Sequence, residues 1–97
     1  VKLKSYASSI AHMYFNVGVA YYMLKQVSNA KFYFEHSINL ASFNYTHEAY
    51  KFLGDIYYQE LNVVKAKENY TLYLQTAPPH DKYRPIVITI LKELNQK

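Results

Sequence analysis

Few side chains in this sequence have the types and spacing that catalysis or metal binding requires. The sequence has no cysteine, and its histidines lack the short separations of paired metal ligands. They are His12, His36, His47 and His80. His47 is followed by Glu48, but a base and an acid need a nucleophile or an oxyanion donor beside them to make a site. There is no glycine-rich phosphate loop and no G-x-S-x-G turn. We therefore expect a non-enzyme without metal or cofactor.

Aromatic and small residues recur instead at a fixed interval. Four positions in the first half return 36 residues later with the same kind of side chain: Tyr14 and Tyr50, Gly18 and Gly54, Ala30 and Ala66, Phe34 and Tyr70. Within each copy, the aromatic residue is followed by a Val-Gly or Leu-Gly pair and then by a second tyrosine. Such self-similarity is the signature of a repeat architecture.

The order of these residues is that of the tetratricopeptide repeat (TPR), which reads aromatic-x2-Leu-Gly-x2-Tyr, then Ala-x3-Phe, then Pro. The chain resembles this family from about Ala11 to Pro78. Its interval of 36 is two residues longer than the usual repeat of about 34, and Ser42 stands where the first repeat would end in proline. The resemblance implies an all-α fold, a right-handed α-solenoid of antiparallel helix pairs, in a single domain over residues 1–97.

Apolar residues spaced by three and four predict five helices. We expect them over about 3–24, 28–41, 46–60, 63–76 and 81–95, which makes repeat one about 11–44, repeat two about 47–80 and a closing helix about 81–96. Ser28, Thr46 and Asp81 are the predicted N-caps. Pro78 and Pro79 should end the fourth helix, because proline cannot continue the hydrogen-bond ladder.

The resemblance also implies a binding surface, because the first helix of each TPR lines a concave groove. The groove positions hold His12, Phe15, Asn16, Val19, Tyr22, Met23, Glu48, Lys51, Phe52, Asp55, Tyr58 and Gln59. Phe15, Tyr22 and Tyr58 are the favoured contacts, since aromatic side chains dominate binding hot spots. Some TPR domains clamp the terminal carboxylate of chaperone tails with Lys and Asn. Phe15 and Val19 occupy such positions here, so this function is not expected.

The resemblance thus implies a non-catalytic scaffold module that binds a protein or peptide. The aromatic groove residues have an alternative role, which is packing against a neighbouring helix. For Glu48, Lys51 and Asp55 the alternative is a set of solvated pairs along one helix. The alternative function is self-association, or a structural segment of a larger TPR protein. Leu3, Tyr6 and Ile10 would then lie on an apolar side of the first helix that lacks a neighbour.

Charge and hydropathy narrow the partner classes. The net charge of +4 comes from scattered lysines with no run of five like charges, so a nucleic-acid partner is not expected. The sequence contains no run of about 18 apolar residues, the length needed to span a membrane. The first residues, Val1 to Ser5, contain no apolar leader. The compartment stays unassigned, with the cytoplasm as default, and the missing initiator Met leads us to expect a piece of a longer protein.

Overall fold

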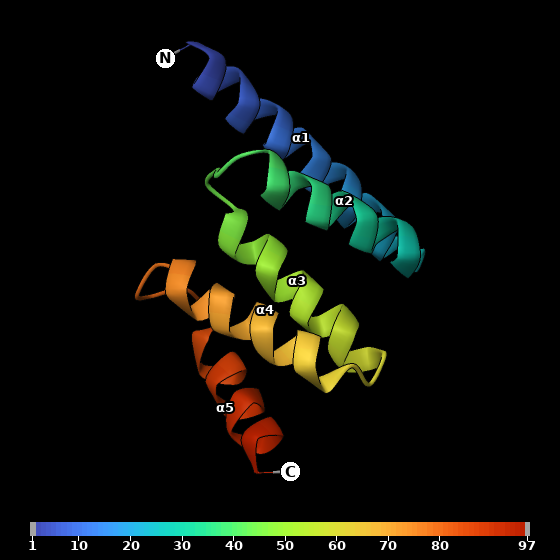
Figure 1. The fold of residues 1–97 in the computed structure, drawn as a ribbon, viewed down its shortest axis with the longest axis vertical. Coiled ribbons are helices and arrows are strands. Elements are labelled where there is room, and N and C mark those ends of the chain that lie inside the picture. Colours follow the sequence, from blue (N-terminus) through green and yellow to red (C-terminus); the bar gives the residue numbers. More distant parts are fainter. Residues whose placement is uncertain (1, 97) are drawn as a thin grey trace.

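Five α-helices make up the computed structural model, which describes residues 2–96 (Figure 1). They are α1 (Lys2–Met23), α2 (Val27–Leu40), α3 (Thr46–Gln59), α4 (Val63–Thr76) and α5 (Arg84–Asn95). No strand occurs within this described range. The prediction of an all-α chain with five helices is confirmed, and each predicted boundary lies within three residues of the observed one.

Two helical hairpins, α1–α2 and α3–α4, repeat the same turn. Lys25 and Leu61 lie 36 residues apart, and each has a φ of 62°, in the left-handed region. In the first turn the amides of Lys25 and Gln26 donate to the carbonyls of Tyr22 and Tyr21, at 3.0 and 2.9 Å. The corresponding bonds of the second turn measure 3.1 and 2.9 Å. This Schellman motif satisfies the last carbonyls of a helix, so the 36-residue interval is also present in the backbone.

Gly18 and Gly54 are matching points of close approach between the helices of each hairpin. A Cβ atom on Gly18 would lie 2.9 Å from ring atoms of Phe34, and one on Gly54 would lie 2.6 Å from the ring of Tyr70. Real Cβ atoms essentially never approach a carbon this closely. The aromatic side chain of one helix therefore occupies the space that glycine leaves on the other.

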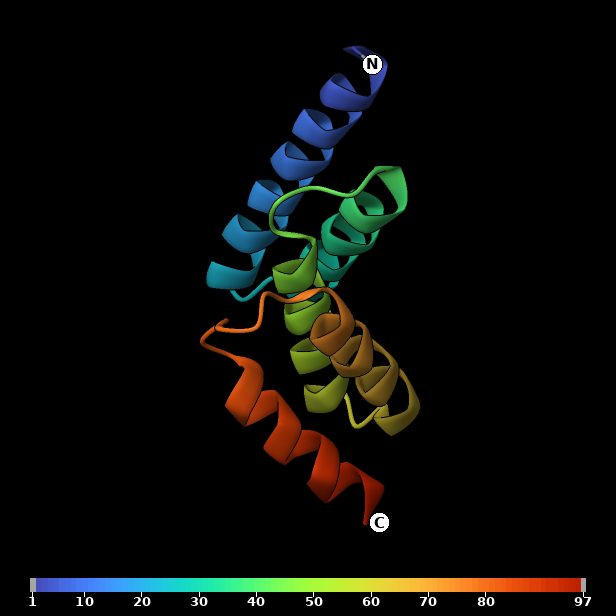
Figure 2. The ribbon, with the colours of Figure 1, turned by 90° about the vertical axis from the view of Figure 1, so that its left-hand side faces the viewer.

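The helices are stacked in sequence order, each packed against the next. The molecule measures 45 × 30 × 20 Å, so it is longer than a sphere of the same mass. Figure 2 shows α2 and α4 together on one side, with α1 and α5 largely on the other. The core follows the long axis and joins all five helices through buried side chains that include Phe15, Phe34, Ile56, Tyr73 and Val87.

All three predicted N-caps are wrong. Gln26 precedes α2, Tyr45 precedes α3 and Tyr83 precedes α5, in place of the predicted Ser28, Thr46 and Asp81. The carboxylate of Asp81 instead accepts hydrogen bonds from the hydroxyl of Tyr73 on α4 and from the backbone amide of Tyr83. Because Asp81 is held by α4, the chain makes one more turn before α5 begins.

Three buried tyrosines donate hydrogen bonds to carboxylates on other segments. The pairs are Tyr57 with Glu35 at 2.7 Å, Tyr70 with Asp55 at 2.6 Å, and Tyr73 with Asp81. Burial raises the pKa of each tyrosine hydroxyl well above its usual range, and the hydrogen bond to a carboxylate raises it further. Each hydroxyl is therefore a neutral donor that satisfies a partly buried carboxylate and links two elements of the stack.

The close approach at Gly54 generates a first prediction. Gly54→Ala should lower the free energy of unfolding by about 1–3 kcal/mol, the usual cost of overpacking, although alanine is the better helix former. The Tyr70 ring is fully buried and held by its bond to Asp55, so it cannot move aside easily. Denaturant titrations followed by circular dichroism measure the change. In a Tyr70→Leu background the same substitution should cost less, and an equal cost in both backgrounds would show that the ring does not exclude the methyl group.

Opposing influences act on the pKa of Asp81. Partial burial disfavours the charged form, but the hydrogen bonds from Tyr73 and from the Tyr83 amide, together with His47 at 3.4 Å, outweigh it and lower the pKa. A carboxyl group whose pKa falls on folding stabilises the protein above its unfolded pKa. That contribution is lost as the pH falls through the folded pKa.

Asp81→Asn should therefore lower the free energy of unfolding by about 1–2 kcal/mol near neutral pH, because a charged acceptor is replaced by a neutral one. The difference from the wild type should begin to shrink as the pH falls below about 4, the usual pKa of an aspartate, and should be lost below the lowered pKa of folded Asp81, where the wild-type carboxyl is also neutral. Denaturant titrations across this range measure it. Glu93→Gln, at an exposed position of α5, is the control. A difference that does not depend on pH would refute the assignment.

Candidate functional site

Phe15 is the predicted groove residue that the structure removes from the groove. Its side chain is only 6% exposed, and its ring centroid lies 5.7 Å from those of Phe34 and Phe43 and 6.2 Å from that of Phe52. Tyr45, in the segment between α2 and α3, stacks on it at 6.0 Å. The prediction that Phe15 is open to a partner is wrong, because the α2–α3 loop folds over this part of α1.

His12 lies in the same aromatic cluster. It is half-buried, with its ring 5.9 Å from Phe43 and 5.0 Å from Tyr45. Nearby, the hydroxyl of Ser8 donates to the carbonyl of Ser42 at 2.8 Å, which ties the loop to α1. The loop therefore occupies the N-terminal part of the predicted groove, and His12 contacts it.

Tyr22 joins α1 to α3. Its ring meets Phe52 edge to face at 5.1 Å, and its hydroxyl accepts a hydrogen bond from the side-chain amide of Gln59 at 3.3 Å. Phe52 in turn stacks on Phe34 in the core at 4.9 Å. Tyr22 is half-buried, so one side of its ring packs inward while the hydroxyl reaches the surface.

Lys51 and Asp55 lie one turn apart on α3 and form an ion pair of 2.6 Å. The Lys51 ammonium is also 4.4 Å from the centroid of the Tyr83 ring, and the second oxygen of Asp55 accepts the bond from Tyr70. Glu48, on the same helix, is half-buried. The Lys51–Asp55 pair is thus engaged in contacts that connect α3 with α4 and with the segment before α5.

The remaining groove residues are more open. Asn16, Met23, Tyr58 and Gln59 are exposed, and Val19 is half-buried against the core. Met23 is 76% exposed and Tyr58 is 42% exposed, which is high for large apolar side chains. The exposed apolar members lie near the C-terminal ends of α1 and α3, away from the loop that covers Phe15.

A hollow of about 440 Å³ lies where α1 and α3 end. It is lined by Tyr22, Met23, Lys25, Val27 and Gln59. The sequence predicted three of these residues but missed Lys25 and Val27, which belong to the turn and to the start of α2. A lysine does not signal a left-handed helix end as glycine does. The sequence therefore predicted a turn between the helices at about 3–24 and 28–41, but not the left-handed geometry that places Val27 beside Tyr22.

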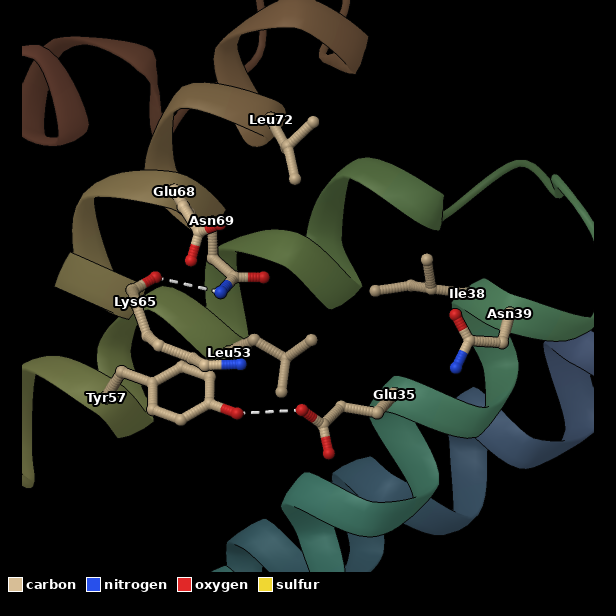
Figure 3. A pocket seen from close by; sticks show the side chains of 9 residues that line it. All are labelled: Glu35, Ile38, Asn39, Leu53, Tyr57, Lys65, Glu68, Asn69 and Leu72. Carbon is tan, nitrogen blue, oxygen red and sulfur yellow. Dashed lines mark hydrogen bonds between the residues drawn. The ribbon is translucent and has the colours of Figure 1, made fainter. Parts of the chain in front are cut away.

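A second hollow, of about 390 Å³, lies between α2 and α4 (Figure 3). It is lined by Glu35, Ile38, Asn39, Leu53, Tyr57, Lys65, Glu68, Asn69 and Leu72. Its charged groups of both signs turn toward Tyr57: Glu35 accepts the hydrogen bond of the Tyr57 hydroxyl, and the Lys65 ammonium lies 5.7 Å from the ring centroid. No predicted groove residue lines it, and these contacts already engage Glu35 and Lys65.

The described part of the chain contains no cluster of three or more His, Asp or Glu that could hold a metal ion. Over the same residues, no helix is both long enough and apolar enough to cross a membrane. Comparisons with protein-family models, with curated proteins and with solved structures found no match. The information on function therefore comes from the geometry of this chain.

Proposed function

We propose that this chain is a non-catalytic, TPR-like module that binds a segment of another protein along the face formed by α1, α3 and α5. Two hairpins with the same Schellman turn and the same glycine–aromatic contact support the finer fold, a right-handed solenoid of helix pairs closed by α5. In such an array, neighbouring repeats share one core, and the first helices of the repeats form a continuous surface.

The observation that carries the proposal is the hollow at the ends of α1 and α3. Its volume of about 440 Å³ suits one large side chain, and the apolar groups of Tyr22, Met23 and Val27 surround it. Tyr58 is exposed on the adjacent helix. Tyrosine and methionine offer large contact areas that adapt to a ligand, and both are common at interface centres.

Charge defines the ligand further. Lys25 is the one charged residue that lines the hollow, and it is exposed. A peptide with Asp or Glu beside an apolar side chain would therefore be attracted to this end of the groove, since complementary charge speeds association and selects partners. The proposed ligand is an acidic segment that inserts one apolar anchor between Tyr22 and Val27.

Selection from a random peptide library displayed on phage tests the proposal without a known partner. Selected peptides should share an apolar residue next to an acidic one. Their affinity, measured by fluorescence polarisation, should fall about tenfold or more in Met23→Ala/Tyr58→Ala, the loss expected of interface anchors. Both residues are exposed, so the thermal unfolding midpoint should stay close to that of the wild type.

Val64→Ala is the matched control. Val64 is 71% exposed, but it belongs to α4 and does not line the hollow at the ends of α1 and α3. It should leave the affinity unchanged. If no peptides are selected, or if the selected peptides bind the Met23/Tyr58 double variant as tightly as the wild type, this groove is not the binding site.

A further inference from the structure

A stripe of apolar side chains runs along α1 and onto the residue that follows it, on a face that none of the other described helices covers. Its members recur at intervals of four and three, which place them on one side of a helix. They are Tyr6, Ile10, Met13, Val17, Ala20 and Leu24. All six are exposed, and the five larger ones expose between 39% and 65% of their surface. Single exposed apolar residues are common, but a contiguous row along a whole helix marks an interaction surface.

The second hairpin shows how the equivalent face of α3 packs when a neighbouring helix is present. The positions of α3 that lie 36 residues after Met13, Val17 and Ala20 are Ala49, Leu53 and Ile56. Each is at most 2% exposed, buried where α3 packs against its neighbouring helices. The same face of α1 is therefore of the kind that packs against another helix.

The spacing of the stripe is the same in both directions. Read from either end, the intervals are four, three, four, three and four. If two copies of α1 are placed antiparallel about a two-fold axis, Tyr6 faces Leu24 of the other copy. Ile10 then faces Ala20, and Met13 faces Val17, so large side chains meet smaller ones along most of the seam. A two-fold interface requires such self-complementarity.

The apolar area of the stripe is close to the area that a specific dimer buries. At their exposed fractions, the stripe residues leave on the order of 300 Å² of apolar surface uncovered in each copy, taking roughly 200 Å² for a tyrosine and about 100 Å² for an aliphatic side chain. With the polar rim that interfaces include, two copies would bury about 1,000 Å² in total. This is the lower limit for a biological interface and the range of weak, reversible association.

Charge repulsion does not act at the centre of this antiparallel helix pair. The α1 segment has no acidic residue, and its lysines, Lys2 and Lys4, lie in its first turn, while Lys25 follows its other end. Each copy has a net charge of +4, so two copies repel each other at long range. Added salt screens such repulsion, whereas it would weaken the binding of an acidic helix to the same face.

We infer that this chain forms a weak homodimer in which two copies of α1 pack antiparallel through the stripe Tyr6–Leu24. The interface lies on the face of α1 that points away from α3, so it is separate from the hollow at Tyr22 and Met23. The dimer does not depend on the proposed peptide groove, and either can fail without the other.

Sedimentation equilibrium across concentrations from about 10 μM to 1 mM, the range of weak reversible complexes, tests the inference on the full chain. The weight-average mass should rise from one chain toward two, and the dimer should become tighter with added salt. Met13→Lys should weaken dimerisation about tenfold or more, because it buries a charge in the seam. Val64→Lys, with the same charge change on α4, should not. A chain that stays monomeric throughout overturns the inference and leaves a foreign helix as the occupant of the stripe.

Cysteine cross-linking tests the antiparallel register, since the chain has no cysteine of its own. A mixture of Ile10→Cys and Ala20→Cys chains should form a disulfide-linked heterodimer under mild oxidation, while each variant alone should cross-link poorly. Disulfides need Cα atoms within about 7 Å. Efficient cross-linking of each variant with itself, and no disulfide-linked heterodimer in the mixture, would show parallel helices and overturn the inference. Both substituted residues are exposed, so a thermal melt should confirm that the variants stay folded.

Discussion

The rest of the structure depends on the close contact between a glycine on the first helix of each hairpin and an aromatic ring on the second. Gly18 receives Phe34 and Gly54 receives Tyr70, at distances that leave no space for a side chain. This contact sets the register of each helix pair, and the left-handed turns at Lys25 and Leu61 are compatible with that register. Once both pairs have the same register, α2 can pack against α3, and one core continues through the stack.

The buried tyrosines show how a stack with few residues per layer accommodates polar atoms. Phenol rings fill the core while their hydroxyls reach carboxylates at its edge, on Glu35, Asp55 and Asp81. A buried carboxylate without a donor would be costly, and no buried side-chain nitrogen or oxygen in the described residues lacks a partner. These bonds run between segments, so they bind the layers together as well as satisfying the charges. Among the surfaces left open are the hollow at the ends of α1 and α3 and the outer stripe of α1.

Much of the fold could be predicted because helix periodicity and the 36-residue interval are local properties of the sequence. The five helices, the loop at residues 41–45 and the stop before Pro78 follow from them. The candidate site was harder to predict from the sequence, because the exposure of a side chain depends on contacts between distant segments. The aromatic type of Phe15 suits a groove and a core equally, and only the path of the Phe43–Tyr45 loop decides between them. Similarly, Asp81 has the right type for an N-cap, but Tyr73 on α4 engages its carboxylate.

Nuclear Overhauser contacts in solution test the central claim, the common register of the two hairpins, most directly. The Hα protons of Gly18 should show cross-peaks to the ring protons of Phe34, and those of Gly54 to the ring protons of Tyr70. Both glycine signals should also be displaced by the ring currents of these side chains. Cross-peaks from either glycine to a different ring, or from only one of the two, would contradict the shared register.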